Sequence, residues 1–513
     1  MKRIFRAVKL SVVLAFLAAC GGGSLNNELG LYVINASPDS PPINFLIDGT
    51  LWFSHDYKGG GTGGELTPGT RRIGLQVVLP GDDVLIEASV PLLAGHQYTT
   101  IAVGKLGEEG SSTLQMLHID NLATAVPTGT TRIQFVHAAP NMASAIDVYL
   151  TAPTDSLAAA TPSFSVSYIQ QPPALQQNLP SGTWRIRVTP SGDRNTVLFD
   201  SGEVTLRSTA NLLFLAVANT GAGTAPISLL VTDSIFPAGI LPPREILNVA
   251  TPADVRVYNV SPDLPSLVVT AERVLRKDTL PPDPPLASPC IYDPTLAADD
   301  VLCVAPPPEV ASLVTSLTYP AAASYAGIDP AIPPQAGYAF LNSTDSYSFK
   351  VAATDAPATV LFGTSLSLVP GNRSSLLTVG LVPQPVGGVV TAKTLAVLND
   401  DIRPVARVGK LRIVDASVAG GTVDVYIKAQ GTDLGNETAN LPNLGLGSAT
   451  GHLGFAPGPY TVSFTTVGTK TVLASVNIDA LSDSVFTVVL VDTARSISGD
   501  GTPPEVMVID DLL

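Results

Sequence analysis

The phrase LYVINASPD at residues 31–39 decides the fold of this protein, because versions of it recur three times further along the chain. The recurrences read IQFVHAAPN at residues 133–141, VRVYNVSPD at residues 255–263 and LRIVDAS at residues 411–417. Each version is a run of β-branched and aromatic residues that ends in a turn, which is typical of a β-strand. A phrase that returns at long intervals indicates tandem copies of one structural unit.

Other features follow each phrase in the same order. A second strand is predicted at residues 43–47, 146–150 and 423–427, where Asp147 and Asp424 share one position and Asn44 takes it in the first unit. A Val-Leu pair then recurs at residues 84–85, 197–198, 360–361 and 472–473. The closing strands end in acidic residues, which are Asp120, Asp233, Asp400 and Asp510. We therefore expect four homologous units.

Each unit offers about seven short strands separated by Gly, Pro, Asn and Asp turns, which is typical of a two-sheet antiparallel sandwich. The sequence predicts an all-β protein with four tandem immunoglobulin-like antiparallel β-sandwich domains after a lipoprotein signal peptide. The expected bounds are 1–19 for the signal peptide, 20–30 for a lipidated flexible tether, 31–124 for repeat 1, 130–237 for repeat 2, 252–404 for repeat 3 with a Pro-rich insertion at 274–312, and 409–513 for repeat 4. Units of roughly 100 residues can bury a core alone, so beads laid end to end would form a rod on the order of 100 Å.

The composition argues against one class of partner. The 513 residues include 28 Lys and Arg against 43 Asp and Glu, a formal net charge of -15. Such a chain has little attraction for phosphate backbones, so we expect no nucleic-acid partner. Hydrophobic residues make up 45% and charged residues 14%, which allows buried cores and argues against a disordered acidic polymer.

The amino terminus resembles a bacterial lipoprotein signal. A basic stretch through Lys9 precedes an apolar run at residues 10–17 that is too short to span a bilayer. Residues 17–20 read LAAC, which resembles a lipobox and implies lipidation of Cys20 by diacylglycerol and an acyl chain such as palmitate. Gly21 follows Cys20, which favours the outer membrane, on either its periplasmic or its exposed face. The alternative is a plain secretory signal with an incidental cysteine.

The strand, turn and strand at residues 137–150 resemble the repeated exported domain of unknown function numbered 4397. Residues 35–39 match the same opening, and the resemblance covers nearly all of the chain after residue 30. It is weakest in the third unit, where Val268 stands at the position of the strand Asp. Proteins of this family resemble immunoglobulin-like sandwiches and carry no assigned activity. The resemblance therefore bears on fold and compartment and leaves the ligand open.

Besides Cys20, the chain has two cysteines, Cys290 and Cys303, in the Pro-rich segment of the third unit. In an exported protein such a pair predicts one disulfide, worth about 3 kcal/mol by the loop-entropy model. The alternative is two free thiols. The insertion itself is either a contact surface or tolerated extra length.

The sequence predicts no catalytic residue, no cofactor and no metal site. The histidines, His55, His96, His118, His137 and His452, are scattered without the spacing of metal ligands. His137 ends a predicted first strand, so we expect it to bond turn backbone rather than act as a base. Gly59, Gly61 and Gly64 spell GxGxxG, but no helix follows, so we expect a loop rather than a nucleotide site.

Two other groups of residues could bind a ligand. Acid pairs at residues 82–83, 299–300, 400–401 and 510–511 could lend oxygens to calcium, although none has the EF-hand spacing and solvated turn acids are the plainer interpretation. Trp52 and Tyr57 could form an aromatic platform for a sugar, whereas Trp184 is expected in a core.

These features together predict a lipid-anchored, non-catalytic cell-envelope protein. It would be attached to the membrane through its N-terminal lipid and act as a binding, adhesive or spacer module for a protein or glycan ligand on the cell surface. The alternative is an accessory or catalytic protein that acts on envelope polysaccharide.

Overall fold

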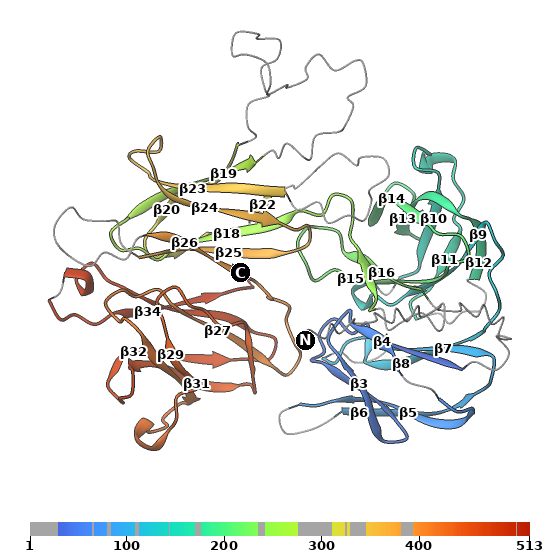
Figure 1. Ribbon diagram of the computed structural model, residues 1–513, viewed down its shortest axis with the longest axis horizontal. Helices are drawn as coiled ribbons and strands as arrows, with labels where there is room; N and C mark the ends of the chain where they lie inside the picture. Colours follow the sequence, from blue (N-terminus) through green and yellow to red (C-terminus); the bar gives the residue numbers. More distant parts are fainter. Residues whose placement is uncertain are drawn as a thin grey trace, which may run out of the picture.

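The computed structural model describes residues 29–63, 66–79, 84–107, 112–142, 144–169, 176–233, 242–274, 310–323, 326–328, 345–380, 393–498 and 500–512. Over these residues the regular structure consists of β-strands and single turns of 3₁₀ helix, without an α-helix (Figure 1). None of the described residues form a helix with the length and apolar character needed to cross a bilayer. The prediction of an all-β protein is confirmed.

The strands form four modules, each built from two sheets: module 1 (residues 30–122), module 2 (130–246), module 3 (253–399) and module 4 (409–510). In module 1 one sheet has the order β4 (Gly60–Thr62), β1 (Gly30–Asn35), β7 (His96–Val103), β8 (Gln115–Leu122). The other has the order β3 (Thr50–His55), β2 (Ile43–Ile47), β5 (Gly69–Val77), β6 (Val84–Leu92). The two sheets enclose the module's apolar core, so the expected sandwich is confirmed.

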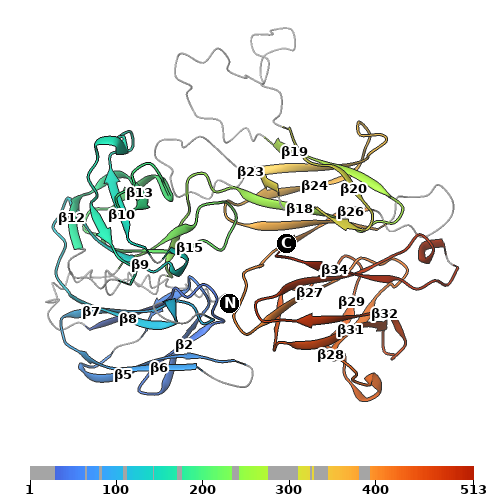
Figure 2. The ribbon, with the colours of Figure 1, turned by 180° about the vertical axis from the view of Figure 1, so that it is seen from behind.

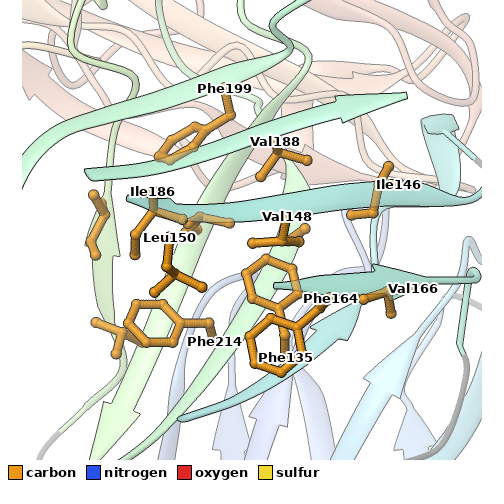
Figure 3. Packing of buried hydrophobic residues seen from close by; sticks show 14 of the residues in the cluster. Phe135, Ile146, Val148, Leu150, Phe164, Val166, Ile186, Val188, Phe199 and Phe214 are labelled. Carbon is orange, nitrogen blue, oxygen red and sulfur yellow. The ribbon is translucent and has the colours of Figure 1, made fainter. Parts of the chain in front are cut away.

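Module 2 repeats this plan with one added edge strand. Its first sheet has the order β12 (Gln176–Pro180), β9 (Thr130–His137), β15 (Asn211–Ala218), β16 (Ile227–Asp233), β17 (Arg244–Ile246). Its second has the order β11 (Phe164–Val166), β10 (Ile146–Thr151), β13 (Gly182–Pro190), β14 (Phe199–Leu206). Phe135 lies between the sheets, with its ring centroid 6.2 Å from that of Phe164 and 6.4 Å from that of Phe214 (Figure 3).

Modules 3 and 4 follow the same order. In module 3 the first sheet has the order β21 (Ala321–Ala322), β18 (Ala253–Asn259), β25 (Arg373–Val379), β26 (Thr394–Asn399), and β22 (Ala326–Ile328) also pairs with β18. The second sheet has the order β20 (Val310–Thr318), β19 (Ser266–Val274), β23 (Asp345–Ala353), β24 (Val360–Leu368). In module 4 the first sheet has the order β30 (Leu453–Phe455), β27 (Gly409–Asp415), β33 (Val485–Val491), β34 (Glu505–Asp510). The second sheet has the order β29 (Leu441–Leu444), β28 (Val423–Ala429), β31 (Gly458–Thr466), β32 (Val472–Ala480).

One sheet of every module contains a parallel pair of strands, so the sandwiches are not purely antiparallel as predicted. The motif strand pairs in parallel with a later strand: β1 with β7, β9 with β15, β18 with β25 and β27 with β33. The register is also shared, because Leu31 lies opposite Tyr98 and Leu411 lies opposite Phe486. We call this the mixed sheet of each module. The second sheet is antiparallel throughout.

The mixed sheets are covered on both faces, which explains their nearly continuous apolar sequence. All seven residues of β27 and seven of the eight residues of β9 are buried. Parallel strands buried on both sides carry such runs, whereas a strand with one wet face alternates. The antiparallel sheets do alternate, as in β6, where exposed residues separate inward-facing ones. One face of each mixed sheet covers the core of its own module, and the other face contacts a neighbouring module.

The modules form two pairs through these outer faces rather than lying end to end. Apolar residues of β1, β7 and β8 in module 1 form one cluster with residues of β9, β15 and β16 in module 2. The mixed sheets of modules 3 and 4 form an equivalent cluster. The pairs lie side by side (Figures 1 and 2), joined by backbone hydrogen bonds from Ala222 to Gly371 (2.9 Å) and from Ala406 to Asp39 (2.7 Å). The expected rod of separate beads is therefore wrong, because an apolar sheet face is stable only when it is covered.

Candidate functional site

A cleft of about 460 Å³ lies where the two module pairs meet. Its walls come from module 1, module 2, module 3 and the linker between modules 3 and 4, at residues 56–58, 220–221, 371–373 and 399–403. We call it the central cleft. Four separate parts of the chain build it, and ligand sites are common at such junctions between domains.

Arg403 of the linker holds one wall of the central cleft against module 1. Its Nη1 donates to the carbonyl oxygens of Pro38 (3.1 Å) and Ser40 (2.8 Å), and its Nη2 donates to Oδ1 of Asp56 (2.7 Å). The Arg403 side chain is only 9% exposed. Hydrogen bonds from a charged group to buried acceptors are among the stronger ones in proteins, so Arg403 fixes the linker to the first module.

The turn after β3 connects module 1 to module 2. The phenol of Tyr57 donates to the carbonyl oxygen of Ala218 at 2.6 Å, and Nζ of Lys58 lies 2.5 Å from Oε1 of Glu245. Burial, with the nearby Glu245 carboxylate, raises the pKa of Tyr57 well above its usual value. Tyr57 is therefore a neutral hydrogen-bond donor that joins two modules.

Arg373 and Asp401 also line the cleft. Nε of Arg373 lies 3.2 Å from Oδ2 of Asp254, and its Nη1 donates to the carbonyl oxygen of Thr220 at 3.2 Å. Oδ2 of Asp401 accepts from Nζ of Lys410 at 2.8 Å. The cationic side chains that line this cleft, Lys58, Arg373 and Arg403, are thus all paired with carboxylates of the protein itself.

The carboxylates of Asp56 and Asp401 are the accessible charges of the cleft, since each side chain is 62% exposed. The amides of Asn372 and Asn399 line the cleft beside them. Carboxylates and amides accept and donate hydrogen bonds to hydroxyl and amine groups. The arrangement can therefore bind a polar, hydrogen-bonding ligand. No group of three or more His, Cys, Asp or Glu side chains suited to a metal ion occurs within the described ranges.

Several predicted residues lie outside the described residues: Cys20, Cys290, Cys303, Gly64 and the acid pairs at 82–83 and 299–300. The lipid attachment and the disulfide therefore stay predictions.

His137 has the backbone role that its position predicts. Its Nε2 lies 2.6 Å from the carbonyl oxygen of Met142 and 3.2 Å from that of Ser144, while its Nδ1 accepts from the N–H of Ala139 at 3.4 Å. Burial lowers the pKa of His137, which keeps the ring neutral. It closes the turn after β9.

The other histidines are kept apart by the fold. Nδ1 of His96 lies 2.6 Å from Oδ1 of Asp120, and Nδ1 of His118 lies 2.9 Å from the hydroxyl of Thr100, both in module 1. His55 also belongs to module 1, and burial lowers its pKa. His452 contacts Asp511 in module 4 at 3.0 Å.

The Gly-rich segment forms an edge strand, β4, instead of the predicted loop. It pairs with β1, and a Cβ atom on Gly60 would lie 2.5 Å from the carbonyl oxygen of Val33. Glycine is required there because the two strands approach too closely for a side chain. Gly60 is not one of the three glycines of the GxGxxG pattern, but at Gly59, the first of them, a Cβ atom would lie 2.9 Å from the carbonyl oxygen of Asp56.

The three aromatic candidates have separate roles. Trp52 packs on the core of module 1, whereas Tyr57 is partly buried against the cluster between modules 1 and 2, so the two do not form one platform. Trp184 packs against the core of module 2 as predicted, and its Nε1 donates to the carbonyl oxygen of Pro180 at 3.0 Å.

Among the acid pairs, Asp400 and Asp511 are buried with no exposed side-chain surface, contrary to the expected solvated turns. Each forms an ion pair across the interface between modules 3 and 4, Asp400 with Arg412 and Asp511 with Arg256. Their neighbours Asp401 and Asp510 are not buried. The sequence feature that could have indicated these buried ion pairs is the arginine within two of the apolar motif strands, VRVY at residues 255–258 and LRIV at residues 411–414.

Comparison with known families recovers part of the repeat pattern. Residues 30–149 and 409–512 match the model of the family described as Domain of unknown function (DUF4397). These two stretches are similar to that family, and together they cover less than half of the chain. The first DUF4397 match covers module 1 and continues through the first two strands of module 2, and the second covers module 4. Module 3 lies outside both matches, yet its sheets have the same strand order.

The other comparisons add little. No curated protein matches the chain. Two crystal structures of Salmonella alpha-2-macroglobulin, a mutant and the methylamine-reacted protein, are 9% and 8% identical to it, with a TM-score of 0.09 for each. The alignments cover 86% and 87% of this chain but only 29% and 30% of those proteins, so the chain spans less than a third of their length.

Proposed function

We propose that this protein is a non-catalytic binding protein of the cell envelope, anchored to the outer membrane by lipid on Cys20. Its ligand binds in the central cleft, and the hydrogen-bonding walls favour a polar ligand such as a glycan. The observation that carries the proposal is the cleft itself, which is built from three modules and a linker.

The charged side chains around the cleft support binding rather than catalysis. Arg403 is held by Asp56 and two carbonyl oxygens, and Lys58 is held by Glu245. Tyr57 is partly buried, and its phenol donates to the carbonyl oxygen of Ala218. A group that transfers protons must be free to exchange them with a substrate. These side chains are instead committed to contacts that join modules.

The first described strand, β1, begins away from the cleft and ends beside it. Leu29 is buried in the core of module 1, and β1 then runs to Asn35, whose backbone bonds Lys58 and Gly59 beside the cleft. At about 3.3 Å per residue, β1 places Leu29 roughly 20 Å from Asn35.

The anchor is tested by mass spectrometry of the mature N-terminal peptide and by membrane fractionation of the Cys20→Ala variant. We expect a triacylated Cys20 and release of the variant from the membrane fraction. An unmodified N-terminal peptide would refute the anchor. Protease shaving of intact cells then identifies the membrane face on which the modules lie.

The cleft is tested with the lipidated full chain in detergent. The probe is a set of soluble oligosaccharides released from the envelope of the producing bacterium, followed by saturation-transfer NMR. The Asn372→Trp variant fills the cleft, whereas Asn195→Trp places the same bulk on an exposed loop of module 2. We expect binding to be lost in the first variant and kept in the second. Equal signals from both variants, or none from the native chain, would reject the cleft as a glycan site.

A further inference from the structure

Two ion pairs at the central cleft expose their carboxylates and cover their cations. The Arg403 side chain is 9% exposed, whereas its partner Asp56 is 62% exposed. The Lys410 side chain is 8% exposed, and its partner Asp401 is again 62% exposed. The two other cationic side chains of the lining are also less exposed than these carboxylates. A ligand that enters the cleft therefore meets negative charge first.

Both carboxylates can accept further hydrogen bonds. Oδ1 of Asp56 accepts from the backbone N–H of Tyr57 and from Nη2 of Arg403, each at 2.7 Å, and no other described residue donates to Oδ2. Oδ2 of Asp401 accepts from Nζ of Lys410 at 2.8 Å, and its Oδ1 accepts from the backbone N–H of Arg403 at 3.3 Å. Since each carboxylate oxygen has two lone pairs, acceptor sites remain on both side chains.

Arg403 positions the two carboxylates relative to each other. Its guanidinium holds Asp56 and its backbone N–H holds Asp401. The same guanidinium is fixed by the carbonyl oxygens of Pro38 and Ser40. Desolvation raises the pKa of Asp401, but the hydrogen bond from Lys410 and the nearby charges outweigh it and lower the pKa. The acceptors are therefore ordered before a ligand binds, which reduces the entropy lost on binding.

The rest of the lining is polar and neutral. The side chains of Asn372 and Asn399 are exposed, and neither amide is bonded to another described residue. Apart from Tyr57 and Ile402, the residues that line the cleft are polar or are glycines. Amides suit the hydroxyl groups of a sugar ring. The long apolar stem of a lysine side chain finds little apolar surface here, which favours a sugar over a basic peptide.

We infer that the ligand of the central cleft is a glycan with a free amino group, that is, an amino sugar that is not N-acetylated. Its ammonium group binds the carboxylates of Asp56 and Asp401, and its hydroxyl groups bind the amides of Asn372 and Asn399. An ammonium has three donors and no acceptor, so it matches two acceptor carboxylates. N-acetylation removes the positive charge and two of the three donors. This inference rests on the proposed glycan site and adds the charge of the ligand to it.

The first test compares two ligands on the native, lipidated full chain in detergent. The probes are the β-1,4-linked disaccharide of glucosamine and its di-N-acetylated counterpart, each titrated at pH 6 and followed by saturation-transfer NMR. We expect the amino form to bind at least about tenfold more tightly. Equal affinities that are both lost in Asn372→Trp would overturn the amino-sugar inference and keep the cleft as a glycan site. Binding that survives in Asn372→Trp, or no binding of either probe, would overturn both proposals.

The second test separates the cleft carboxylates from the general attraction of an acidic chain for cations. Asp56→Asn and Asp401→Asn each remove one charge at the cleft, and Asp479→Asn removes one charge at an exposed position of β32. We expect each cleft variant to bind the amino disaccharide at least about tenfold more weakly, and the control to change less than about twofold. Equal losses in all three variants would overturn the inference.

Two further measurements complete this comparison. Binding of the N-acetylated disaccharide, which does not need the carboxylates, should be the same in the native chain and in Asp56→Asn and Asp401→Asn, because the cleft keeps its shape. A loss of this binding in step with that of the amino form would assign the carboxylates to the structure of the cleft and overturn their role in charge recognition. Nα-acetyl-lysine amide is the peptide probe. If it bound as tightly as the amino disaccharide, the ammonium alone would be recognised, and the assignment to a sugar would be wrong.

Discussion

Nη1 of Arg403 lies 2.8 Å from the carbonyl oxygen of Ser40, although 363 positions separate the two residues in the chain. This contact joins the linker of the second module pair to the first module. Ala406, three residues later, is part of the apolar core cluster of module 1. The linker between modules 3 and 4 is therefore a structural part of module 1 rather than a flexible hinge.

Replacement of Arg403 should open this junction. In Arg403→Met the apolar stem is kept but the buried carbonyl oxygens of Pro38 and Ser40 lose their donor, so we expect a loss of about 3–5 kcal/mol. Calorimetry and limited proteolysis at residues 400–408 provide the measurement. Arg207→Met is the control, because the Arg207 side chain is 75% exposed in a surface ion pair, which is worth about 0–1 kcal/mol. A proteolysis rate unchanged in Arg403→Met would contradict this role.

Asp415 should make module 4 less stable as the pH rises. It is fully buried at the end of β27, and burial raises its pKa to about 7, with Asp492 adding to the shift. Because the folded form holds the proton more tightly than the unfolded form, stability is greatest below about pH 4 and falls as the pH rises toward 7. Hydrogen exchange at residues 411–415, measured at pH 5 and pH 8, reports the change after correction for the intrinsic pH dependence of exchange.

The Asp415→Asn variant should remove this pH dependence. Asn259 occupies the same position in module 3, where its amide donates to the carbonyl oxygens of Leu264 (3.0 Å) and Leu317 (3.1 Å). A neutral amide in module 4 avoids the buried charge, so we expect slower exchange at pH 8 and no gain at pH 4. The reverse substitution, Asn259→Asp, should destabilise module 3 at neutral pH. A gain in Asp415→Asn that persists at pH 4 would point to a cause other than titration.

Asp147 should hold the turn between β13 and β14. Burial favours its neutral form, but hydrogen bonds from the N–H of Gly192 (2.8 Å) and the hydroxyls of Ser165 and Ser191 outweigh burial and lower its pKa. We expect Asp147→Ala to cost about 1–3 kcal/mol at pH 7. The cost should shrink as the pH falls and the native Asp147 becomes protonated. Urea unfolding monitored by Trp184 fluorescence at pH 7 and pH 3 measures both effects.

The hydroxyl of Tyr57 should stabilise the contact between modules 1 and 2. Tyr57→Phe leaves the carbonyl oxygen of Ala218 without its donor, so we expect a loss of about 1–2 kcal/mol in calorimetric unfolding. Tyr460→Phe is a matched control, since the Tyr460 phenol donates to Ala456 within module 4. A control variant that speeds proteolysis between modules 1 and 2 as much as Tyr57→Phe would refute the assignment to this interface.

The repeated phrases predicted the number of modules, the sandwich and the motif strand, because side-chain pattern and turn residues are local properties. The parallel pairing of β1 with β7 was not predictable in that way, since Leu31 and Tyr98 are brought together only by strands that cross between sheets. The arginines in the runs VRVY and LRIV did indicate buried ion pairs. An arginine within a fully buried strand needs a buried carboxylate, but the sequence does not say that Arg412 finds it at Asp400 in another module.

The central cleft was not predictable because no single segment contains it. Lys58 and Arg403 lie in loops and Arg373 begins β25, and their proximity depends on how the pairs of modules lie. The role of His137 was predictable, because a side chain at the end of a strand contacts the turn that follows it.

The position of Ala406 has a consequence for the order of biosynthesis. Module 1 is translated before modules 2, 3 and 4, but the Ala406 methyl group in its core belongs to a segment made almost 300 residues after the module's last strand ends. Until that segment arrives, the nascent first sandwich has an unfilled site beside Gly107. Truncation before residue 406 would leave a permanent defect at the opposite end of the polypeptide.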